Sequence, residues 1–377
     1  MNTLHACGIV AEYNPLHNGH LYQMRLAREK TNCDLLVVVL SGNFTQRGEP
    51  AIFNKWIRAK EAVKNGVDLV IELPYVYATQ SATGFAKGAI QALSLAHVDW
   101  LCFGSECGNL DNLQEIAQTP INPDHLHQSM DQGMSFPKTY SLLSSEMRPN
   151  DILAASYLKQ LQGTNIKPIV VQRTTNYLDS ALHSTASALA IRQAIKNGQD
   201  LLDTTPMKDI CLSRECAWPQ LFYPYFRTFI LTSTPETLSK LFLFSEGIEN
   251  LFIKNAKQED TYEGFLNACT NYRYTSGRIR RCMLQAMNQV TKEEVQHLPE
   301  LDRFRVLCFN DIGREYLKQL SANEVLYSSR FAQVPQPYRD MEYRSSLLYT
   351  SVLSNTLRRE ILQNEIGGAL YIKNDDR

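Results

Sequence analysis

The fold is decided by one stretch near the start of the sequence, Gly8-Ile9-Val10-Ala11-Glu12-Tyr13-Asn14-Pro15-Leu16-His17-Asn18-Gly19-His20. A short apolar run precedes an Asn-Pro turn, and two histidines follow with a glycine close to the second. This order predicts a buried strand, a loop and the opening of a helix. If Asn18 caps a helix that begins at Gly19, the backbone N–H groups and the positive end of the helix dipole face the loop and attract an anion.

The two histidines of this stretch, His17 and His20, are candidates for chemistry on a phosphate. Imidazole N–H groups at this place donate to phosphate oxygens and stabilise the charge that develops when the bond between two phosphates of a nucleotide breaks. Gly19 lets a phosphate or an adenine approach the backbone closely. Two other interpretations stay open, a pair of helix-capping histidines and two metal ligands. No carboxylate or third histidine follows at a helical spacing, so we predict no metal site.

Strand-like and helix-like segments alternate through the first half of the sequence. The continuous apolar run Leu35–Leu40 is typical of a parallel strand that is covered on both faces. The alternation predicts an α/β fold with a doubly wound, Rossmann-like parallel sheet, whose ligand lies off the carboxyl ends of the strands. The expected strands are 6–11, 35–40, 69–71, 98–103 and 166–172, and the expected helices are 19–30, 53–65, 81–96, 150–161 and 187–197.

The sequence divides into two expected domains. Residues 1–205 form the nucleotide-binding core, in which 108–148 are an insertion of helical fragments broken by prolines. Residues 206–377 form a mostly α-helical C-terminal domain, because strand signals weaken from Pro206 onward and helical spacing dominates. The clearest helical spacings there are 236–244, 277–290 and 304–320.

A second candidate segment is the loop Ser41–Pro50, which follows the second expected strand. By the topology of a doubly wound sheet it faces the same crevice as His17. It offers small residues, an amide and an arginine where a substrate carboxylate fits, and a solvated turn is the alternative. The candidates for a carboxylate site are Gly42, Asn43 and Arg47. Lys55 and Arg58 on the next helix are further candidates for phosphate contacts.

A third candidate segment is Ser184–Arg192, in which hydroxyls open a helix and an arginine follows about one turn later. Backbone N–H groups, the Ser187 hydroxyl and the Arg192 guanidinium would then hold the β- and γ-phosphates of a triphosphate. A serine cap with an incidental surface arginine is the alternative. Three smaller signals lie where crevice residues are expected, at Gly104, Asn150 and Arg173.

A basic segment lies in the second half, at residues 271–290. It contains four arginines and two tyrosines and no acidic residue. One apolar helical face would be buried and the arginines left exposed, which suits RNA, because its phosphates bind guanidinium groups and its unstacked bases bind aromatic rings. A plain solvated helix stays open as the alternative. The candidate RNA-binding residues are Arg273, Arg278, Arg280 and Arg281.

Bulk composition restricts the class of protein. The 38 Lys and Arg residues nearly balance the 39 Asp and Glu residues, so a nucleic-acid partner must be held by a local patch. Nine scattered cysteines, an odd number, favour reduced core thiols and a cytoplasmic location. No apolar run approaches the roughly 18 residues of a transmembrane helix, so we predict no membrane association.

Five segments together resemble the bacterial tRNA(Met) cytidine acetate ligase family. They cover most of the first 200 residues in order, and the second half adds mainly Arg278–Arg281. The resemblance implies an HxGH nucleotidyltransferase fold that binds ATP and acetate, forms acetyl-adenylate with release of diphosphate, and acetylates N4 of the wobble cytidine of elongator tRNA(Met), releasing AMP. The five segments are 8–20, 41–52, 68–74, 103–106 and 187–192.

The resemblance also implies roles for individual residues. His17 and His20 match the HxGH histidines, and Arg192 matches the phosphate-binding end of the later motif; these three are the catalytic candidates. Mg²⁺ is expected on the ATP phosphates without a protein cage, and no obligate protein partner is implied. The implied ATP contacts are Val10, Ala11, Glu12, Tyr13, Asn14, Pro15, Leu16, His17, Asn18, Gly19, His20, Leu21, Tyr22, Gln23, Gly104, Asn150, Arg173, Ser187 and Arg192.

Two other functions stay open from the sequence. An HxGH nucleotidyltransferase that adenylylates a small phosphorylated acceptor would need no helical RNA-binding domain and would ignore acetate. A nonenzymatic RNA-binding protein would use the nucleotide-binding fold only as a scaffold.

Overall fold

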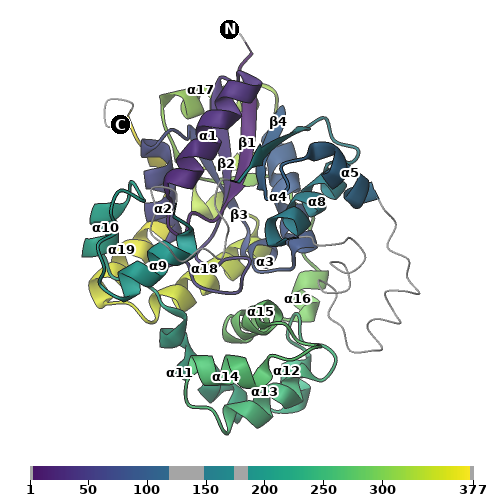
Figure 1. Ribbon diagram of the computed structural model, residues 1–377, viewed down its shortest axis with the longest axis vertical. Helices are drawn as coiled ribbons and strands as arrows, with labels where there is room; N and C mark the ends of the chain where they lie inside the picture. The colour runs from purple at the N-terminus through teal and green to yellow at the C-terminus, as the bar shows by residue number, and fades with distance from the viewer. Residues whose placement is uncertain (1–2, 119–147, 174–185, 374–377) are drawn as a thin grey trace.

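The computed structural model describes residues 3–118, 148–173 and 186–373, and its centre is one eight-stranded sheet (Figure 1). Strand β1 (Ala6–Ala11) lies between β2 (Leu35–Ser41) and β4 (Trp100–Ser105), and both neighbours run parallel to it. The strand order is β5-β4-β1-β2-β3-β6-β7, with β8 beside β6. The chain therefore builds outward from β1 in both directions, which confirms the predicted α/β class and puts the switch point of the sheet between β1 and β4.

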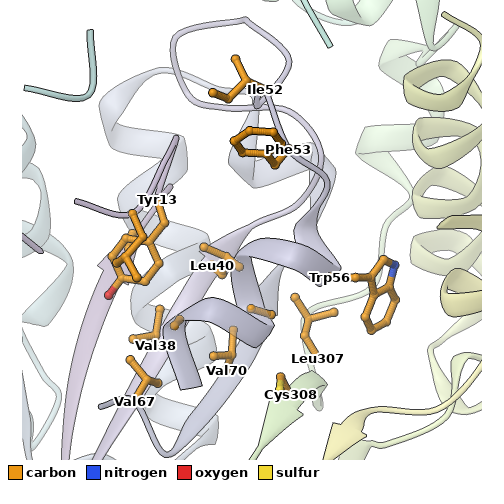
Figure 2. Packing of buried hydrophobic residues seen from close by; sticks show 14 of the residues in the cluster. Tyr13, Val38, Leu40, Ile52, Phe53, Trp56, Val67, Val70, Leu307 and Cys308 are labelled. Atoms are coloured by element: carbon orange, nitrogen blue, oxygen red, sulfur yellow. The ribbon is translucent and has the colours of Figure 1, made fainter. Parts of the chain in front are cut away.

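Helices cover both faces of the sheet. On one face lie α1 (Asn18–Thr31) and α2 (Lys55–Lys64), and on the other lie α4 (Ala82–Leu95) and α8 (Pro149–Leu161). Alternate residues of β2 enter the two apolar clusters, so every side chain of that strand is buried. Figure 2 shows part of the first cluster, where Val38, Leu40 and Val70 of the sheet share the core with Trp56 and Phe53.

The end of the chain returns to this sheet. Strand β6 (Phe304–Phe309) pairs antiparallel with β3 (Leu69–Leu73), and α17 (Asp311–Ala322) packs into the second apolar cluster. The prediction of continuous helical structure over 304–320 is therefore wrong for its first six residues. A short apolar run has no periodicity that separates a buried strand from a buried helix, which is the physical reason for the error.

In the sequence, a group of helices with its own hydrophobic core comes between β5 and β6; we call this group the helical layer. It consists mainly of α11 (Pro219–Thr232), α13 (Ile248–Ala256), α14 (Tyr262–Cys269) and α15 (Ser276–Met287), and Figure 1 shows it below the sheet. The ring centroids of Phe226, Phe252 and Phe265 lie 5.2 to 5.7 Å apart, and all three pairs are edge to face. The mostly helical character of this region is confirmed, whereas the division at residue 205 stays a prediction.

The remaining elements complete the layers. Of the expected helix 236–244, only the first part is helical. In the expected insertion, α5 (Leu110–Gln118) packs against α8. Residues 119–147 of that insertion, and 184 and 185 of the third candidate segment, lie outside the described residues. The other elements are β5 (Lys167–Gln172), β7 (Tyr327–Ser328), β8 (Leu370–Tyr371), α3 (Tyr75–Ala78), α5 (Leu110–Gln118), α9 (Ala188–Lys196), α10 (Lys208–Ser213), α12 (Pro235–Ser239), α16 (Lys292–Gln296), α18 (Gln336–Thr350) and α19 (Asn355–Ile366).

Two of the bulk expectations meet the structure directly. All nine cysteines are free thiols, and most of them are buried. Across the described ranges, no helix combines the length and the apolar character needed to cross a bilayer.

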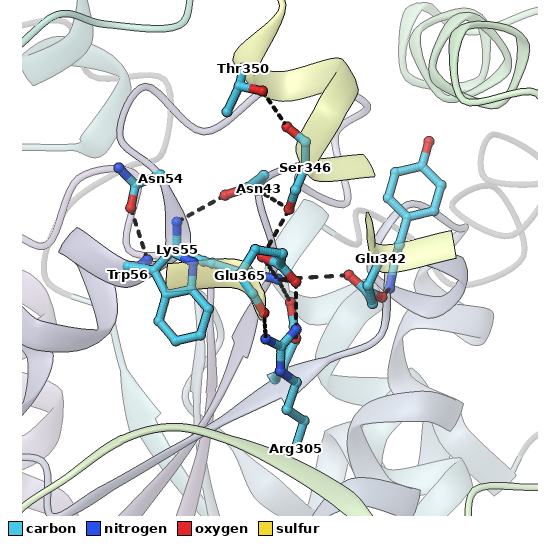
Figure 3. Close-up of polar contacts among 12 residues, drawn as sticks. Asn43, Asn54, Lys55, Trp56, Arg305, Glu342, Ser346, Thr350 and Glu365 are labelled. Carbon is cyan, nitrogen blue, oxygen red and sulfur yellow. Dashed lines mark hydrogen bonds and ion pairs between the residues drawn. The ribbon is translucent and has the colours of Figure 1, made fainter. Parts of the chain in front are cut away.

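A buried ion network joins the returning segment to the core (Figure 3). Lys55 at the start of α2 pairs with Glu72 of β3 and, at 2.9 Å, with Glu365 of α19. Arg305 of β6 lies 3.0 Å from Glu72 and 2.6 Å from Glu365. Burial opposes ionisation of Glu365, but the Lys55 and Arg305 cations lower its pKa to about 2. Burial and the nearby Glu72 carboxylate raise the pKa of Glu342 to about 8.

The structure corrects the expectation that Lys55 and Arg58 contact phosphates. Lys55 is fully buried in its ion pairs, and Arg58 is fully buried with its guanidinium donating to backbone carbonyl groups, including those of Glu12 and Gly42. Neither side chain reaches the cavity described below. Their carboxylate and carbonyl partners come from distant parts of the sequence, so a local pattern of charges on a helix could not reveal them.

Candidate active site

His17 and His20 hold the start of α1 in a reciprocal arrangement. His17 is the N-cap residue, with extended backbone angles (φ −145°, ψ 171°), and its Nδ1 accepts the backbone N–H of Gly19 at 3.1 Å. The backbone N–H of His17 donates in turn to Nδ1 of His20 at 3.2 Å. The expected cap at Asn18 is therefore wrong by one residue: Asn18 is the first residue of the helix, because an imidazole nitrogen takes the capping role that an amide oxygen was expected to fill.

These hydrogen bonds fix the protonation of both rings. Each Nδ1 is an acceptor, so each neutral imidazole carries its proton on Nε2. Burial, reinforced by the Arg173 and Arg192 guanidinium groups, lowers the pKa of His17 to about 3. Burial, with His17 and Arg173 nearby, lowers the pKa of His20 well below its usual value. The pair therefore presents two neutral Nε2–H donors whose orientation is set by the helix start.

The rings also pack against each other and against Tyr13. The His17 and His20 ring centroids lie 3.7 Å apart, and Tyr13 meets His20 edge to face with centroids 4.8 Å apart. Tyr13 is itself buried, and burial raises the pKa of its hydroxyl. The three rings together restrict the rotation of His20.

A cavity opens at the carboxyl ends of β1, β4 and β5, and both histidines line it. This is the switch point of the sheet, where a doubly wound fold binds its ligand. Most of the ATP contacts expected from the sequence meet in this one cavity. They are Val10, Ala11, Glu12, Tyr13, Asn14, His17, His20, Gln23, Gly104, Asn150, Arg173 and Arg192.

The other expected ATP contacts do not line the cavity, and several of them support its walls. Leu16 is fully buried in the core below it. Ser187 caps α9, with its hydroxyl accepting the backbone N–H of Ala190 at 3.1 Å. Asn18 donates to the carbonyl of Asp203. The residues outside the lining are Pro15, Leu16, Asn18, Gly19, Leu21, Tyr22 and Ser187.

Arg192 joins the two predicted halves of the phosphate site. Its guanidinium donates to the carbonyl of Asn14 at 2.8 Å, which ties α9 to the loop after β1. The Asn14 side chain accepts the backbone N–H of Ile52 at 2.9 Å. Segments separated by up to 178 residues in sequence therefore meet around one side of the cavity.

The end of β4 is held by a buried carboxylate that sequence reasoning missed. Asp151 in the first turn of α8 accepts the backbone N–H groups of Glu106 and Cys107 at 2.9 and 3.2 Å and the hydroxyl of Ser105. The neighbouring Asn150 donates to the Glu106 carboxylate. The local signal in the sequence was an acidic residue after the expected Asn150 helix start, which is a favourable position for a carboxylate. Its partners after β4 lie 44 and 45 residues earlier in the chain, so no local pattern identifies them.

The loop after β2 contributes one wall through Arg47, and it is tied to Glu12, which follows β1. The Glu12 carboxylate accepts the backbone N–H of Gln46 at 2.8 Å, and burial raises the Glu12 pKa while Arg47 lowers it. Of the three residues expected to bind a carboxylate, only Arg47 lines the cavity. The Gly42 carbonyl accepts from Arg58, and the Asn43 amide binds Ser346 and the backbone of Lys55.

The four candidate RNA-binding arginines do not form one exposed patch. Arg273 and Arg278 pair with Glu246 at 3.3 and 3.0 Å, and Arg280 pairs with Glu49 at 3.0 Å. Arg281 donates to the carbonyl of Gln46 at 3.3 Å, and burial lowers its pKa to about 10. Only Arg273 is exposed. The expectation of free surface arginines is therefore wrong: the fold brings Glu246 to Arg273 and Arg278 and brings Glu49 to Arg280, and Arg281 is bound by a backbone carbonyl.

Comparisons with known proteins agree along almost the whole chain. The family model described as HIGH Nucleotidyl Transferase matches residues 4–364. The tRNA(Met) cytidine acetate ligase of Anoxybacillus flavithermus is 34% identical over 96% of this chain and 98% of that protein. The Bacillus subtilis protein of the same name is 32% identical over 97% of this chain and 96% of its own length.

Two crystal structures of Thermotoga maritima TmcAL share this fold at 28% sequence identity. The apo form has a TM-score of 0.89 and the form bound with alpha-thio ATP has a TM-score of 0.87. Each comparison covers 98% of this chain and 100% of the crystallised chain.

Proposed function

We propose that this chain, which belongs to the tRNA(Met) cytidine acetate ligase family of HIGH nucleotidyl transferases, is an ATP-dependent, AMP-forming ligase. It activates acetate as acetyl-adenylate and transfers the acetyl group to N4 of the wobble cytidine of elongator tRNA(Met). The observation that carries the proposal is the pair of neutral Nε2–H donors of His17 and His20 in the cavity at the switch point of the sheet. That cavity is where a doubly wound fold binds a nucleotide.

The first half-reaction joins acetate to AMP. An acetate oxygen attacks the α-phosphorus of ATP, the bond from that phosphorus to the bridging oxygen breaks, and diphosphate leaves with the electron pair. His17, His20 and Arg192 supply N–H donors that stabilise the charge on the phosphates in this step. Because both imidazoles are neutral and keep their protons, their role is electrostatic and requires no proton transfer.

Magnesium fits this site as a companion of the nucleotide. Within the described residues, no three His, Cys, Asp or Glu side chains are grouped so that they could hold a metal ion. Phosphate oxygens and water suit Mg²⁺, which is commonly bound through substrate phosphates rather than by a protein cage. We therefore assign Mg²⁺, when it is bound, to the ATP phosphates, where it would neutralise part of their charge.

The second half-reaction delivers the acetyl group to RNA. The cytidine N4 attacks the acetyl carbon, the bond from that carbon to the phosphate oxygen breaks, AMP leaves, and N4 loses a proton. The exocyclic amine of cytidine is a weak nucleophile and reacts slowly, so the site must exclude water that would hydrolyse the mixed anhydride first. Arg47 is our candidate for holding the acetate carboxylate, because it lines the cavity beside Glu12.

The substrates also suggest where the protein works. ATP, acetate and tRNA are found in the cytoplasm, and free buried thiols suit that reducing compartment. We therefore assign the protein to the cytoplasm.

The competing function is an HxGH nucleotidyltransferase that adenylylates a small phosphorylated acceptor. The shared name and the nearly full-length coverage of the curated relatives favour the ligase. Acetate-dependent exchange of labelled diphosphate into ATP, measured without RNA, tests the first half-reaction. A ligase requires acetate for this exchange, whereas exchange at the same rate without acetate would favour the competing function.

A further inference from the structure

A second cleft lies beside the cavity proposed for ATP. Both are lined by Arg47, Glu49 and Arg192, so the two spaces share one wall. The other walls come from α9 and from the helical layer, at the starts of α11 and α14 and in the first half of α15. The cleft therefore leads from the helical layer to the place where acetyl-adenylate would form.

The charge and the aromatic content of this cleft suit a nucleotide. Lys196 and Arg280 add positive charge to the shared arginines, while Glu49 is the acidic residue among the lining. Trp218 and Tyr262 line the same space. Bases stack on aromatic side chains irrespective of their sequence, and backbone phosphates bind cationic side chains.

The cleft wall contains buried polar groups. Oε1 of Gln220 is buried without a hydrogen-bond partner among the described residues, and the buried Tyr262 hydroxyl has the Arg280 side chain as its polar neighbour. Burial raises the pKa of that hydroxyl, and the Arg280 guanidinium lies close enough to oppose the rise. Leaving buried polar groups unpaired is costly, and such groups in a native protein call for an explanation. A nucleobase offers both donors and acceptors on its edges.

We propose that this cleft receives the wobble cytidine of the RNA, unstacked from its neighbours. The base packs on Trp218 beside Tyr262, and Lys196 and Arg280 bind the flanking phosphates. The base edge then faces the wall formed by Arg47 and Arg192, behind which the acetyl group is activated. This inference rests on the proposed function, because it names the place where the RNA substrate of that reaction binds.

The test separates RNA binding from acetate activation. The variants are Trp218→Ala, Trp218→Phe and Lys196→Ala, and each is assayed for acetate-dependent ATP–diphosphate exchange without RNA and for acetyl transfer to elongator tRNA(Met). For Trp218→Ala we expect kcat/KM for the tRNA to fall roughly 5- to 140-fold, the loss that corresponds to one stacked base. Trp218→Phe recovers most of this loss, and Lys196→Ala raises KM for the tRNA more than it lowers kcat.

Exchange stays within about twofold of wild type in all three variants, which also shows that they fold. Tyr225→Ala is the matched control: Tyr225 lies on the same helix, is 55% exposed and does not line the cleft, so both assays should give wild-type rates. Wild-type transfer to tRNA by Trp218→Ala and Lys196→Ala would overturn the proposed nucleoside site. Loss of exchange together with transfer would also overturn it, since the cleft would then belong to the ATP site. A wild-type protein with neither exchange nor transfer would instead refute the proposed function.

Discussion

His20 accepts the backbone N–H of His17 on its Nδ1 atom, and the two imidazole rings lie 3.7 Å apart at the start of α1. Each ring thus serves the helix with one nitrogen and the cavity with the other. The helix start and the proposed phosphate site are built from the same two side chains. Substitutions at these residues should therefore affect both catalysis and the stability of the helix start, and the two effects are measured by separate assays.

Replacement of His20 should abolish most of the adenylation activity. His20→Ala removes one preorganised donor, and such losses reduce rates by about 10²- to 10³-fold. We expect acetate-dependent ATP–diphosphate exchange to fall by that factor while tRNA binding, measured by filter retention, is retained. His5→Ala, at an exposed histidine before β1, is the control and should exchange at the wild-type rate. Normal exchange in His20→Ala with weakened tRNA binding would contradict the role assigned to this residue.

The buried histidines should make folding stability depend on pH. The pKa of His17 is about 3 in the folded protein against a usual value of 6.5, so between these values the unfolded chain binds a proton that the folded chain does not. The free energy of unfolding should therefore fall as pH falls from about 6.5 towards 3, and His17 alone contributes about 2 kcal/mol of this loss by pH 5.

Urea unfolding at pH 7.5 and pH 5 checks this dependence. His17→Asn keeps a side chain able to cap the helix but does not titrate, so its loss of stability between the two pH values should be smaller than that of the wild type by about this amount. Equal losses in both proteins would show that His17 is not a buried neutral group.

The cavity proposed as the nucleotide site was largely predictable because it depends on local signals. A buried strand followed by a turn and a helix start places His17 and His20 at the switch point of the sheet, and the end of β5 places Arg173 there too. The exact cap could not be predicted, because an imidazole and an amide are both able to bind the free N–H groups of a helix start. The strand topology predicted the position of the cavity at the carboxyl ends of the strands.

The contact between the β2–α2 loop and α15 should be sensitive to any side chain at residue 48. Gly48 has φ +79°, and a Cβ atom there would lie 2.6 Å from Cβ of Arg280 and 2.5 Å from the backbone nitrogen of Arg281. A side chain in the left-handed backbone conformation costs roughly 1 to 2 kcal/mol, and we expect Gly48→Ala to destabilise the protein by more than this. We also expect it to lower acetyl transfer, because the loop carries Arg47 and Glu49.

Gly163→Ala is the matched control for this variant. Gly163 has φ +83°, but a Cβ atom there would meet nothing within 4 Å. It therefore carries the same backbone cost without the contact to α15. The difference between the free energies of unfolding of the two variants, measured with urea, gives the contribution of the contact. Equal destabilisation would show that close packing of the loop against α15 does not limit the side chain at residue 48.

The buried ion network should be essential for the attachment of the C-terminal segment. Lys55→Met leaves the carboxylates of Glu72 and Glu365 with too little positive charge, and breaking a buried pair in this way costs about 3 to 5 kcal/mol. Lys208→Met is the control, because Lys208 pairs with Asp200 at 2.8 Å on the surface and should unfold like the wild type. Similar stability of the two variants would contradict the structural role of the network.

The parts that the sequence did not reveal all depend on contacts between distant residues. Lys55 meets Glu365 across 310 residues, and Glu49 meets Arg280 from the opposite half of the chain. Charges that look free in a local segment are paired once the fold is formed, so Lys55 was expected at a phosphate, and Arg278 and Arg280 were expected on an exposed helix face. Strand β6 was missed for a related reason, since its partner β3 lies more than 200 residues earlier and no local signal identifies the pair.

The measurement that tests the central claim most directly is nucleoside analysis of elongator tRNA(Met) after incubation with the protein, ATP and labelled acetate. We expect labelled N4-acetylcytidine at the wobble position, one AMP and one diphosphate for each acetyl group, and labelling about 10²- to 10³-fold slower when His20→Ala replaces the wild type. Unlabelled tRNA in a reaction that releases diphosphate equally well without acetate would contradict the account.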